Sequence, residues 1–421
     1  MKTRFIIAFT LFVLSAHAQI QKCYTYEMMQ HQEQLSPGYL NSVQETFYRA
    51  KQSFSQDRST VYTIPVVVHI VYNGAAENLD DSVVFNQIAV LNETFRRTNP
   101  DTVNMRSVFE PIVGDTYIEF KLAQIDPNGQ PTNGITRTST TQNSFFGVGG
   151  FPAEGVKSSS DGGIDPWDQN RYLNIWVCDM SLLGSPFILG YASPPNNLPH
   201  WPPGSSDNLS DGVVIQYESF GANNPNTLDL GQGVMEVMGK TAVHEVGHYL
   251  GLRHIWGDGD CNEEDGIDDT PNATDQSDFD CDTTKNTCTD NILTLGDLPD
   301  MIENYMDYSS DDCQNSFTQG QADMMRAILE NERIDLISGN PASIEKREDL
   351  YYQIFPNPST SNAIITGLQQ EVSILIFNER GQLVFEKKAS DQVVLPKFDA
   401  GTYSVKLIGS NTVKTERFLQ L

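Results

Sequence analysis

The feature that most constrains this chain is the eleven-residue stretch from His244 to His254, which reads HEVGHYLGLRH. On an α-helix, residues four positions apart lie one turn apart on the same face, so His244 and His248 present their imidazoles to one point. Glu245 stands beside that point. Gly251 can adopt the left-handed conformation that ends a helix and turns the chain back, which allows His254 to supply a third nitrogen.

Three protein ligands with one open coordination position are typical of a catalytic zinc site rather than a structural one. The alternative is an amphipathic core helix whose histidines are hydrogen-bonded. A bare HExxH arises by chance in many chains, but the extended motif fixes five positions in eleven and favours zinc. We therefore predict that His244, His248 and His254 bind zinc. Glu245 is then the general base that takes a proton from the attacking water.

The first eighteen residues have the order of a secretory signal peptide. Lys2 and Arg4 form a charged start, residues 5–14 an apolar core, and residues 16–18 (AHA) a small-x-small cleavage site. The apolar run is too short to span a bilayer, and no other stretch approaches twenty apolar residues. We expect an exported protein with a signal peptide over residues 1–18 and no transmembrane segment.

The charge of the chain is strongly acidic. Its formal value is −28, from 27 basic and 55 acidic side chains, which disfavours nucleic acids and anionic membranes as partners because both would repel it. Between Asp258 and Asp282 there are eleven carboxylates and no Lys or Arg. Such a run is usually a solvated loop. Its place between the zinc motif and two cysteines favours calcium binding.

Six cysteines in an exported chain predict disulfides. Four of them cluster after the zinc motif and allow two bridges in any of three pairings: Cys261, Cys281, Cys288 and Cys313. Cys178 ends an apolar run and is expected to be a buried free thiol.

Residues 19–58 are polar, with two helix-like stretches over 27–34 and 41–51, and we interpret them as a pro-segment. A thiolate is an excellent zinc ligand, so Cys23 from this segment would occupy the water position and hold an enzyme inactive. The alternative is a leftover or intermolecularly bonded cysteine. A cut between Arg58 and Ser59 would release the segment just before the first predicted strand.

Hydrophobic periodicity predicts one domain over residues 59–340, of α+β or α/β class. Its strands are expected over residues 64–72, 118–125, 134–138, 172–178 and 212–218, and its helices over 80–97, 234–250 and 317–333. Residues 182–203 are rich in Gly and Pro and are expected to form a loop that borders a cleft. His69, alone inside a buried strand, is interpreted as structural.

A linker over residues 341–350 precedes a change of character. Residues 351–421 contain short alternating runs, two of them joined by a hairpin signature at 378–381, which predicts a small β-sandwich with no catalytic constellation.

The chain resembles the metzincin metallopeptidases, in their pappalysin-like branch of cytophagalysin and ulilysin type. The resemblance covers residues 59–340 and is carried by HEVGHYLGLRH, residues 268–271 (DDTP), residues 304–308 (NYMDY) and the cysteine pattern. It implies a two-lobed α+β domain, with a twisted mixed sheet plus helices above and an irregular lobe below the active-site cleft.

The resemblance also implies roles for single residues. Met306 would form the hydrophobic turn beneath the metal. Tyr308 would stabilise the tetrahedral intermediate, because a phenol near zinc can hydrogen-bond to an oxyanion; the alternative is plain packing. Asp312 matches a pocket position, where a carboxylate would select Arg or Lys after the scissile bond.

Further implications concern stability. The disulfides would be Cys261–Cys288 and Cys281–Cys313. Structural calcium would bind near Asp265, Asp268 and Thr270, although relatives can use a backbone carbonyl at position 268. Cys23 resembles the pro-segment cysteine of some relatives, and Tyr24 departs from the glycine that often follows it.

The tail, with residues 355–358 (FPNP) and 400–403 (AGTY), resembles the C-terminal sorting domain of type IX secretion. This implies a Gram-negative source and an encounter with the outer-membrane secretion machinery. The alternative is a generic adhesion or carbohydrate-binding sandwich. We expect a secreted or cell-surface, calcium-stabilised zinc endopeptidase that is made as a zymogen and acts on proteins or peptides. The competing hypothesis is a non-catalytic surface binding protein that retains the fold.

Overall fold

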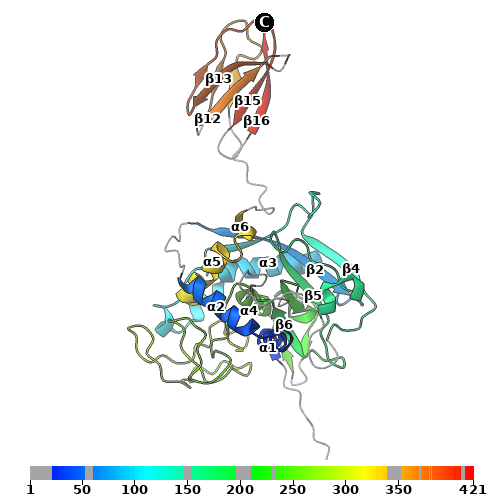
Figure 1. Ribbon diagram of the computed structural model, residues 1–421, viewed down its shortest axis with the longest axis vertical. Coiled ribbons are helices and arrows are strands. Elements are labelled where there is room, and N and C mark those ends of the chain that lie inside the picture. Colours follow the sequence, from blue (N-terminus) through cyan, green and yellow to red (C-terminus); the bar gives the residue numbers. More distant parts are fainter. Residues whose placement is uncertain are drawn as a thin grey trace, which may run out of the picture. The chain divides into compact units, whose positions relative to one another are not determined.

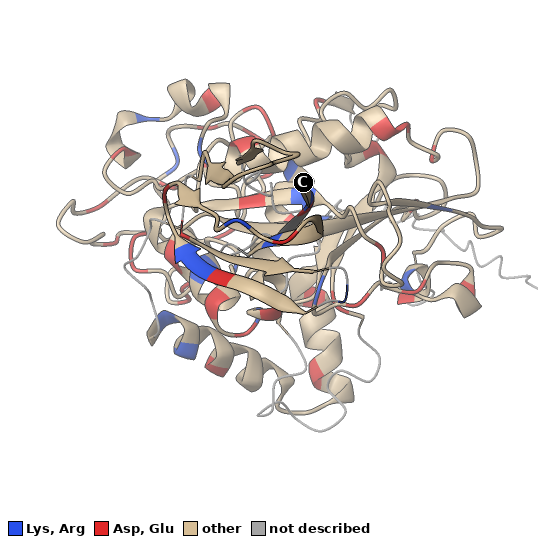
Figure 2. Cartoon of the chain, turned by 90° about the horizontal axis from the view of Figure 1, so that it is seen from above, with Lys and Arg blue, Asp and Glu red and all other residues tan. Residues whose placement is uncertain are grey.

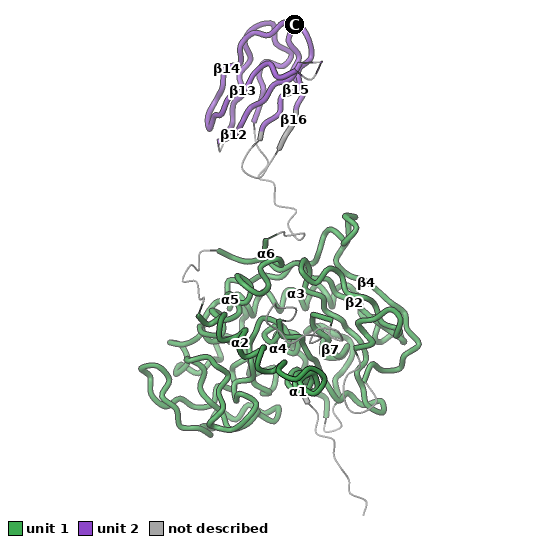
Figure 3. The backbone as a smooth tube through the Cα atoms, in the orientation of Figure 1, with its two compact units in different colours: residues 1–342 green, residues 343–421 purple. Residues whose placement is uncertain are grey.

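The computed structural model describes residues 21–52, 60–146, 154–195, 210–229, 233–338, 352–368, 371–378, 380, 382–408 and 413–421. The expected signal peptide, the 58–59 cut and the linker over 341–350 lie outside these residues. The chain divides into two compact units, residues 1–342 and 343–421, which are described separately (Figure 3).

A seven-stranded sheet forms the centre of the first unit, in the order β1-β6-β7-β5-β2-β3, with β4 also paired to β2. Its strands are β1 (Gln21–Cys23), β2 (Tyr62–Tyr72), β3 (Ile118–Leu122), β4 (Ile135–Ser139), β5 (Leu173–Cys178), β6 (Ile188–Ala192) and β7 (Val213–Gln216). The β-branched run of β2 is buried along most of its length and pairs in parallel with β3, β4 and β5. Such continuous burial is typical of a strand covered on both faces.

Six α-helices lie in the described part of the first unit: α1 (Thr25–Leu35), α2 (Tyr39–Gln52), α3 (Asp81–Phe95), α4 (Lys240–Tyr249), α5 (Gln319–Glu330) and α6 (Asp335–Ser338). α3 and α4 pack on each other, α1 packs against β6, and α2 against α5 (Figure 1). Local sequence fixes two of the helix starts. Asp80 accepts a hydrogen bond from Ser82 N before α3, and Thr318 forms a capping box with Gln321 before α5.

The remaining regular elements of this unit are short. They are the 3-10 turns over Pro100–Asn104, Ser107–Phe109, Glu154–Lys157, Ser159–Asp161 and Tyr217–Ser219, and the ribbon of β8 (Leu228–Asp229) with β9 (Val234–Met235). Between α4 and α5 the chain, which is described throughout, has no helix or strand and is crosslinked by Cys261–Cys288 and Cys281–Cys313. This is the pairing that the resemblance implies. Cys178 is buried and free, as expected.

Two sequence predictions are wrong in their bounds. The motif helix does not begin at residue 234, because residues 234–235 belong to the β8–β9 ribbon and Gly239, with φ +74°, precedes the first turn of α4. Residues 182–203 are not all loop, because they contain β6. This strand has only five residues and a central Gly190, so its stability comes from partners on both sides, β1 and β7, rather than from local propensity.

The second unit consists of two small sheets, β10-β11-β14 and β13-β12-β15-β16, around a common apolar core. Its strands are β10 (Gln353–Phe355), β11 (Ile364–Thr366), β12 (Val372–Phe377), β13 (Leu383–Ala389), β14 (Val393–Val394), β15 (Gly401–Ile408) and β16 (Val413–Gln420). The alternating burial of β12 is typical of a sandwich strand, with Ile374 and Ile376 facing the core. Among the described residues, no helix has the length and apolar character needed to cross a bilayer.

Candidate active site

The motif folds as its spacing predicts. His244 and His248 lie on α4, which ends at Tyr249, and Gly251 adopts φ +92° so that the chain turns back and brings in His254. A side chain at Gly251 would also collide with Ile328 of α5. All three histidines are buried.

Each histidine uses one ring nitrogen to hold itself in place. Nδ1 of His244 lies 2.7 Å from the carbonyl oxygen of Tyr305, and Nδ1 of His248 lies 2.8 Å from that of Leu252. Nδ1 of His254 meets the carboxylate of Asp258. Since these oxygens only accept, each Nδ1 carries the hydrogen and donates it. A neutral ring with its hydrogen on Nδ1 keeps a lone pair on Nε2.

These three lone pairs converge. Nε2 of His248 lies 3.0 Å from Nε2 of His244 and 3.1 Å from Nε2 of His254. Two lone pairs cannot hydrogen-bond to each other, so nitrogens this close are stabilised by a cation between them. Zn–N bonds of ~2.0–2.1 Å in a tetrahedral site place the nitrogens at about this separation. Burial lowers the pKa of His248 to about 3 and that of His244 well below its usual value, which keeps these two rings neutral. The donor set therefore fits zinc.

Met306 lies fully buried beneath the histidines, in the turn that also carries the Tyr305 carbonyl. Asn304 accepts the Met306 N–H at 2.9 Å and fixes the turn. A Cβ at Gly247 would lie 2.5 Å from the Met306 sulfur, so a larger residue at this position would force Met306 to move. Sequence reasoning passed over Gly247 because it looked only at the metal-binding positions.

Glu245 faces the N-terminal segment, which we define as residues 21–52. Its Oε2 accepts hydrogen bonds from the Cys23 thiol at 3.4 Å and from the Thr25 hydroxyl at 3.1 Å. Its Oε1 is buried without a hydrogen-bond partner. Burial raises the pKa of Glu245 to about 8. Gly190 of β6 allows this close approach, since a Cβ there would lie 2.7 Å from Glu245 Cγ.

Cys23 lies directly at the metal site. Its sulfur and one nitrogen from each of the three histidines all lie within 4.8 Å of one another. Burial holds the pKa of this thiol well above its usual value, so it is a hydrogen-bond donor. Tyr308 donates its hydroxyl hydrogen to the Cys23 carbonyl at 2.9 Å, and its ring contacts those of His244 and His254.

Lys22, the residue before Cys23, occupies a buried polar pocket. Its ammonium donates to the Ser309 carbonyl at 2.9 Å and to Gln314 Oε1 at 3.1 Å, and it lies 3.4 Å from Asp311 Oδ1. Asp312 does not line this pocket. Its side chain is exposed beside the Cys281–Cys313 disulfide, because the turn at 310–313 directs the preceding residue inward.

The expected calcium ligands are only partly brought together. Oδ2 of Asp265 and the hydroxyl of Thr270 are buried next to each other with no hydrogen-bond partner outside this pair, and burial raises the pKa of Asp265 to about 8. Such atoms fit a bound cation. The Asp268 carboxylate is largely exposed and instead pairs with Lys51 of α2 at 2.6 Å. Figure 2 shows how widely acidic residues are spread over the helices and loops.

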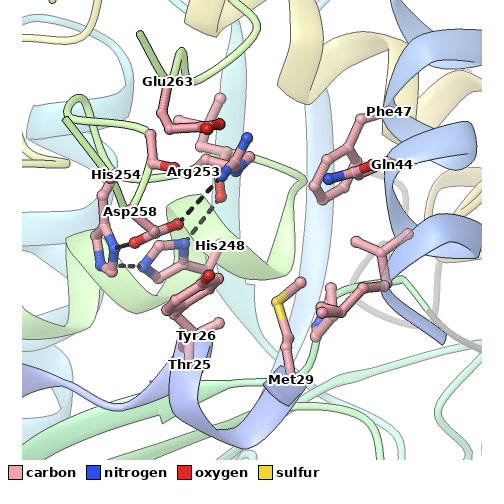
Figure 4. Close-up of a pocket in the computed structure, with 16 residues that line it drawn as sticks. Thr25, Tyr26, Met29, Gln44, Phe47, His248, Arg253, His254, Asp258 and Glu263 are labelled. Carbon is pink, nitrogen blue, oxygen red and sulfur yellow. Dashed lines mark hydrogen bonds and ion pairs between the residues drawn. The ribbon is translucent and has the colours of Figure 1, made fainter. Parts of the chain in front are cut away.

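A cavity of about 300 Å³ remains between the N-terminal segment and the metal site (Figure 4). It is bordered by Met29 and Phe47 from the segment, and by His248, Arg253 and Glu263 from the catalytic side. The segment therefore covers the histidines without filling the whole space next to them.

Sequence reasoning missed Lys22, Thr25, Asp311 and Asp258. A basic residue beside a candidate inhibitory cysteine was a usable signal for Lys22. No sequence signal separated Asp311 from Asp312, or Asp258 from the other carboxylates of the acidic run, because only the fold decides which of them is buried.

Comparisons with known proteins agree with this geometry. Residues 157–330 match the family model described as pregnancy-associated plasma protein-A, and residues 353–420 match that of the secretion system C-terminal sorting domain. An extracellular metalloprotease of Arthroderma benhamiae is 28% identical over 313 residues, which cover 73% of this chain and 86% of the relative.

Two solved structures from Tannerella forsythia are also similar. Mature mirolysin in complex with a cleaved peptide is 41% identical with a TM-score of 0.56, over 66% of this chain and 96% of that one. A promirolysin mutant is 37% identical with a TM-score of 0.61, over 75% of this chain and 97% of that one.

Proposed function

This chain belongs to the pregnancy-associated plasma protein-A (pappalysin) family and is a secreted metalloendopeptidase of a Gram-negative bacterium, and on that premise we propose its mechanism, specificity and latency. Glu245 is the general base of peptide hydrolysis. His244, His248 and His254 hold one zinc ion. The observation that carries this proposal is the convergence of three Nε2 lone pairs beside the buried, unpartnered Oε1 of Glu245.

Zinc, when bound, supplies Lewis acidity toward the attacking water and the scissile carbonyl. Glu245 accepts a proton as the water oxygen adds to the carbonyl carbon, and delivers it to the amide nitrogen as the C–N bond breaks. Tyr308 donates a hydrogen bond to the oxyanion that develops. Burial keeps the pKa of Tyr308 well above its usual value, so that the hydroxyl retains its hydrogen.

The direct test replaces Glu245 by alanine. We expect Glu245→Ala to retain stoichiometric zinc and to lose proteolytic activity after release of the N-terminal segment. Glu93→Ala, at an exposed position on α3, is the matched control and should leave both unchanged. Unchanged activity in Glu245→Ala would rule out the mechanism.

We propose that the enzyme prefers Arg or Lys after the scissile bond, and that the carboxylate of Asp311 rather than that of Asp312 binds this basic side chain. The support is Lys22, which places a basic side chain against Asp311, Gln314 and the Ser309 carbonyl. Lys22 of the N-terminal segment thus occupies the pocket that, in this proposal, binds the basic side chain of the substrate.

The N-terminal segment is the inhibitory part of a zymogen in this proposal. Its strand β1 runs parallel to β6, with Cys23 opposite Gly190, and Cys23 contacts both Glu245 and Tyr308. Cys23 would complete a four-ligand set with the three histidines, and the charge of a bound zinc ion would favour the thiolate form of its sulfur.

Calcium is proposed in the acidic loop, with Asp265 and Thr270 as ligands. Position 268 would contribute its backbone carbonyl rather than the carboxylate, because the carboxylate pairs with Lys51. Adding calcium to zinc-loaded, calcium-free protein should raise its melting temperature, and Asp265→Asn should lose that response. A wild-type melting temperature that does not change with calcium would contradict the site.

A further inference from the structure

The third histidine of the metal site is held differently from the other two. His244 and His248 donate to neutral backbone carbonyls, whereas His254 donates from Nδ1 to the carboxylate of Asp258. The His254 ring also stacks on Trp256, with centroids 4.3 Å apart and planes 4° from parallel. The stacking fixes the plane of the ring but still allows the ring to rotate within that plane. The hydrogen bond to Asp258 prevents this rotation.

Asp258 is built into the site rather than attached to its surface. Its side chain is only 7% exposed, and its backbone has φ +61°, a left-handed conformation that few residues other than glycine adopt. Arg253 holds it there. The guanidinium lies 3.5 Å from Asp258 Oδ2 (Figure 4). It also donates to the carbonyl oxygens of Gly257 and Glu264.

Asp258 differs from an ordinary turn aspartate in the partner that its carboxylate accepts from. Asp260, two residues on, is exposed, and its carboxylate accepts the Asn262 N–H at 2.8 Å, which is a purely local role. The Asp258 carboxylate instead receives the N–H of a residue whose other nitrogen faces the cation site. A buried negative charge at this point pulls on the N–H and makes the opposite nitrogen a stronger donor.

We propose that Asp258 is a positioning residue for the third zinc ligand. It fixes His254 in the tautomer with hydrogen on Nδ1, orients Nε2 toward the other two histidines, and raises the zinc affinity of the site through its charge. The inference rests on the proposed zinc site. The two proposals can fail separately. A wild-type chain that binds no zinc would refute the zinc site itself, whereas a zinc affinity that does not depend on Asp258 would refute only the role of Asp258.

The test measures zinc dissociation constants of the full chain by competition with a chromogenic chelator. Asp258→Asn is the main variant, since asparagine tolerates the left-handed conformation and still accepts the N–H but carries no charge. We expect its zinc affinity to fall by about 10-fold, and that of Asp258→Ala by up to about 100-fold. Asp260→Asn, on the same loop, is the matched control and should stay within about twofold of wild type by the same measure.

Two further readouts distinguish positioning from simple support of the fold. The melting temperature of metal-free Asp258→Asn should equal that of the metal-free wild type, and the visible spectrum of its cobalt-substituted form should change. In the zinc-loaded wild type, the Nδ1 proton of His254 should resonate farther downfield than those of His244 and His248. Equal zinc affinities for wild type and Asp258→Asn, or equal proton shifts for the three histidines, would overturn the proposal.

Discussion

At the scale of single residues, three side chains within four positions of the N-terminal segment contact three different parts of the candidate active site. Lys22 lies in the buried pocket of Asp311 and Gln314 that we propose for a basic substrate residue, Cys23 lies next to the three histidines, and Thr25 donates to Glu245, the proposed general base. If these proposed roles hold, the N-terminal segment covers the specificity pocket, the metal ligands and the base together. Latency in such an arrangement does not depend on one bond alone.

Replacing Cys23 by alanine tests the contact next to the three histidines. We expect the uncleaved Cys23→Ala chain to gain ~10-fold or more in activity on a fluorogenic peptide, since ~1.4 kcal/mol of segment binding corresponds to a factor of ten. Thr25→Val should add to this gain by freeing Glu245. Cys178→Ala, at the other free cysteine, is the control. A Cys23→Ala zymogen as silent as the wild type would refute the switch.

The neighbouring pair Asp311 and Asp312 provides an internal control for specificity. Asp311→Asn removes the charge but keeps an acceptor for the Met238 and Lys240 N–H groups that its Oδ2 receives. Loss of a charge-assisted hydrogen bond of about 1.5–3 kcal/mol predicts a ~10- to 150-fold lower kcat/KM for peptides with Arg after the scissile bond, relative to Leu. Asp312→Asn should leave that ratio unchanged. The reverse result would restore Asp312 as the specificity residue.

At the scale of elements, sequence pattern predicted what local chemistry dictates. The sequence predicted β2 and α3 to within two residues at each end, from a β-branched run and from hydrophobic periodicity, and the motif spacing predicted the turn at Gly251. β6 could not be predicted, because a short strand with a central glycine depends on partners that are distant in sequence. The same limit applied to Asp311, whose burial depends on contacts with Lys22 and with the start of α4.

The central strand β2 carries an acid-sensitive group, His69. It is fully buried between Thr136 and Asn174, 2.7 Å and 3.0 Å away, and burial lowers its pKa to about 4. An unfolded histidine titrates near ~6.5, so the unfolded chain binds more protons as pH falls from ~6.5 toward ~4. The free energy of unfolding therefore decreases through this window, by roughly 3 kcal/mol from His69 alone.

His69→Gln should remove this contribution. We expect its unfolding free energy, from urea denaturation, to fall less than that of the wild type between pH 7 and pH 4. All other histidines are the same in both proteins, so their effect cancels in the comparison. Parallel pH profiles for the two proteins would show that His69 remains neutral for another reason or contributes nothing.

At the scale of the whole molecule, secretion and catalysis belong to separate compact units. The second unit has its own apolar core, which includes Ile365, Ile374 and Phe418, and matches a sorting domain over residues 353–420. All residues that we assign to the reaction belong to the first unit, whose core surrounds α4 and the central sheet. Export and activity should therefore be separable by truncation.

A chain that ends at residue 342 should fold, bind zinc and cleave peptides once the N-terminal segment is released, because each unit buries its own core. In a bacterium with type IX secretion, however, it should accumulate inside the cell, since the element that the export machinery reads is gone. Immunoblots and activity assays of cells and culture supernatant measure both effects. Full-length Glu245→Ala is the control, since it should be exported although inactive. Mass spectrometry of the wild-type supernatant would show whether the second unit is retained or removed after export. Export of the truncated chain at the wild-type level would mean that the first unit carries its own export signal.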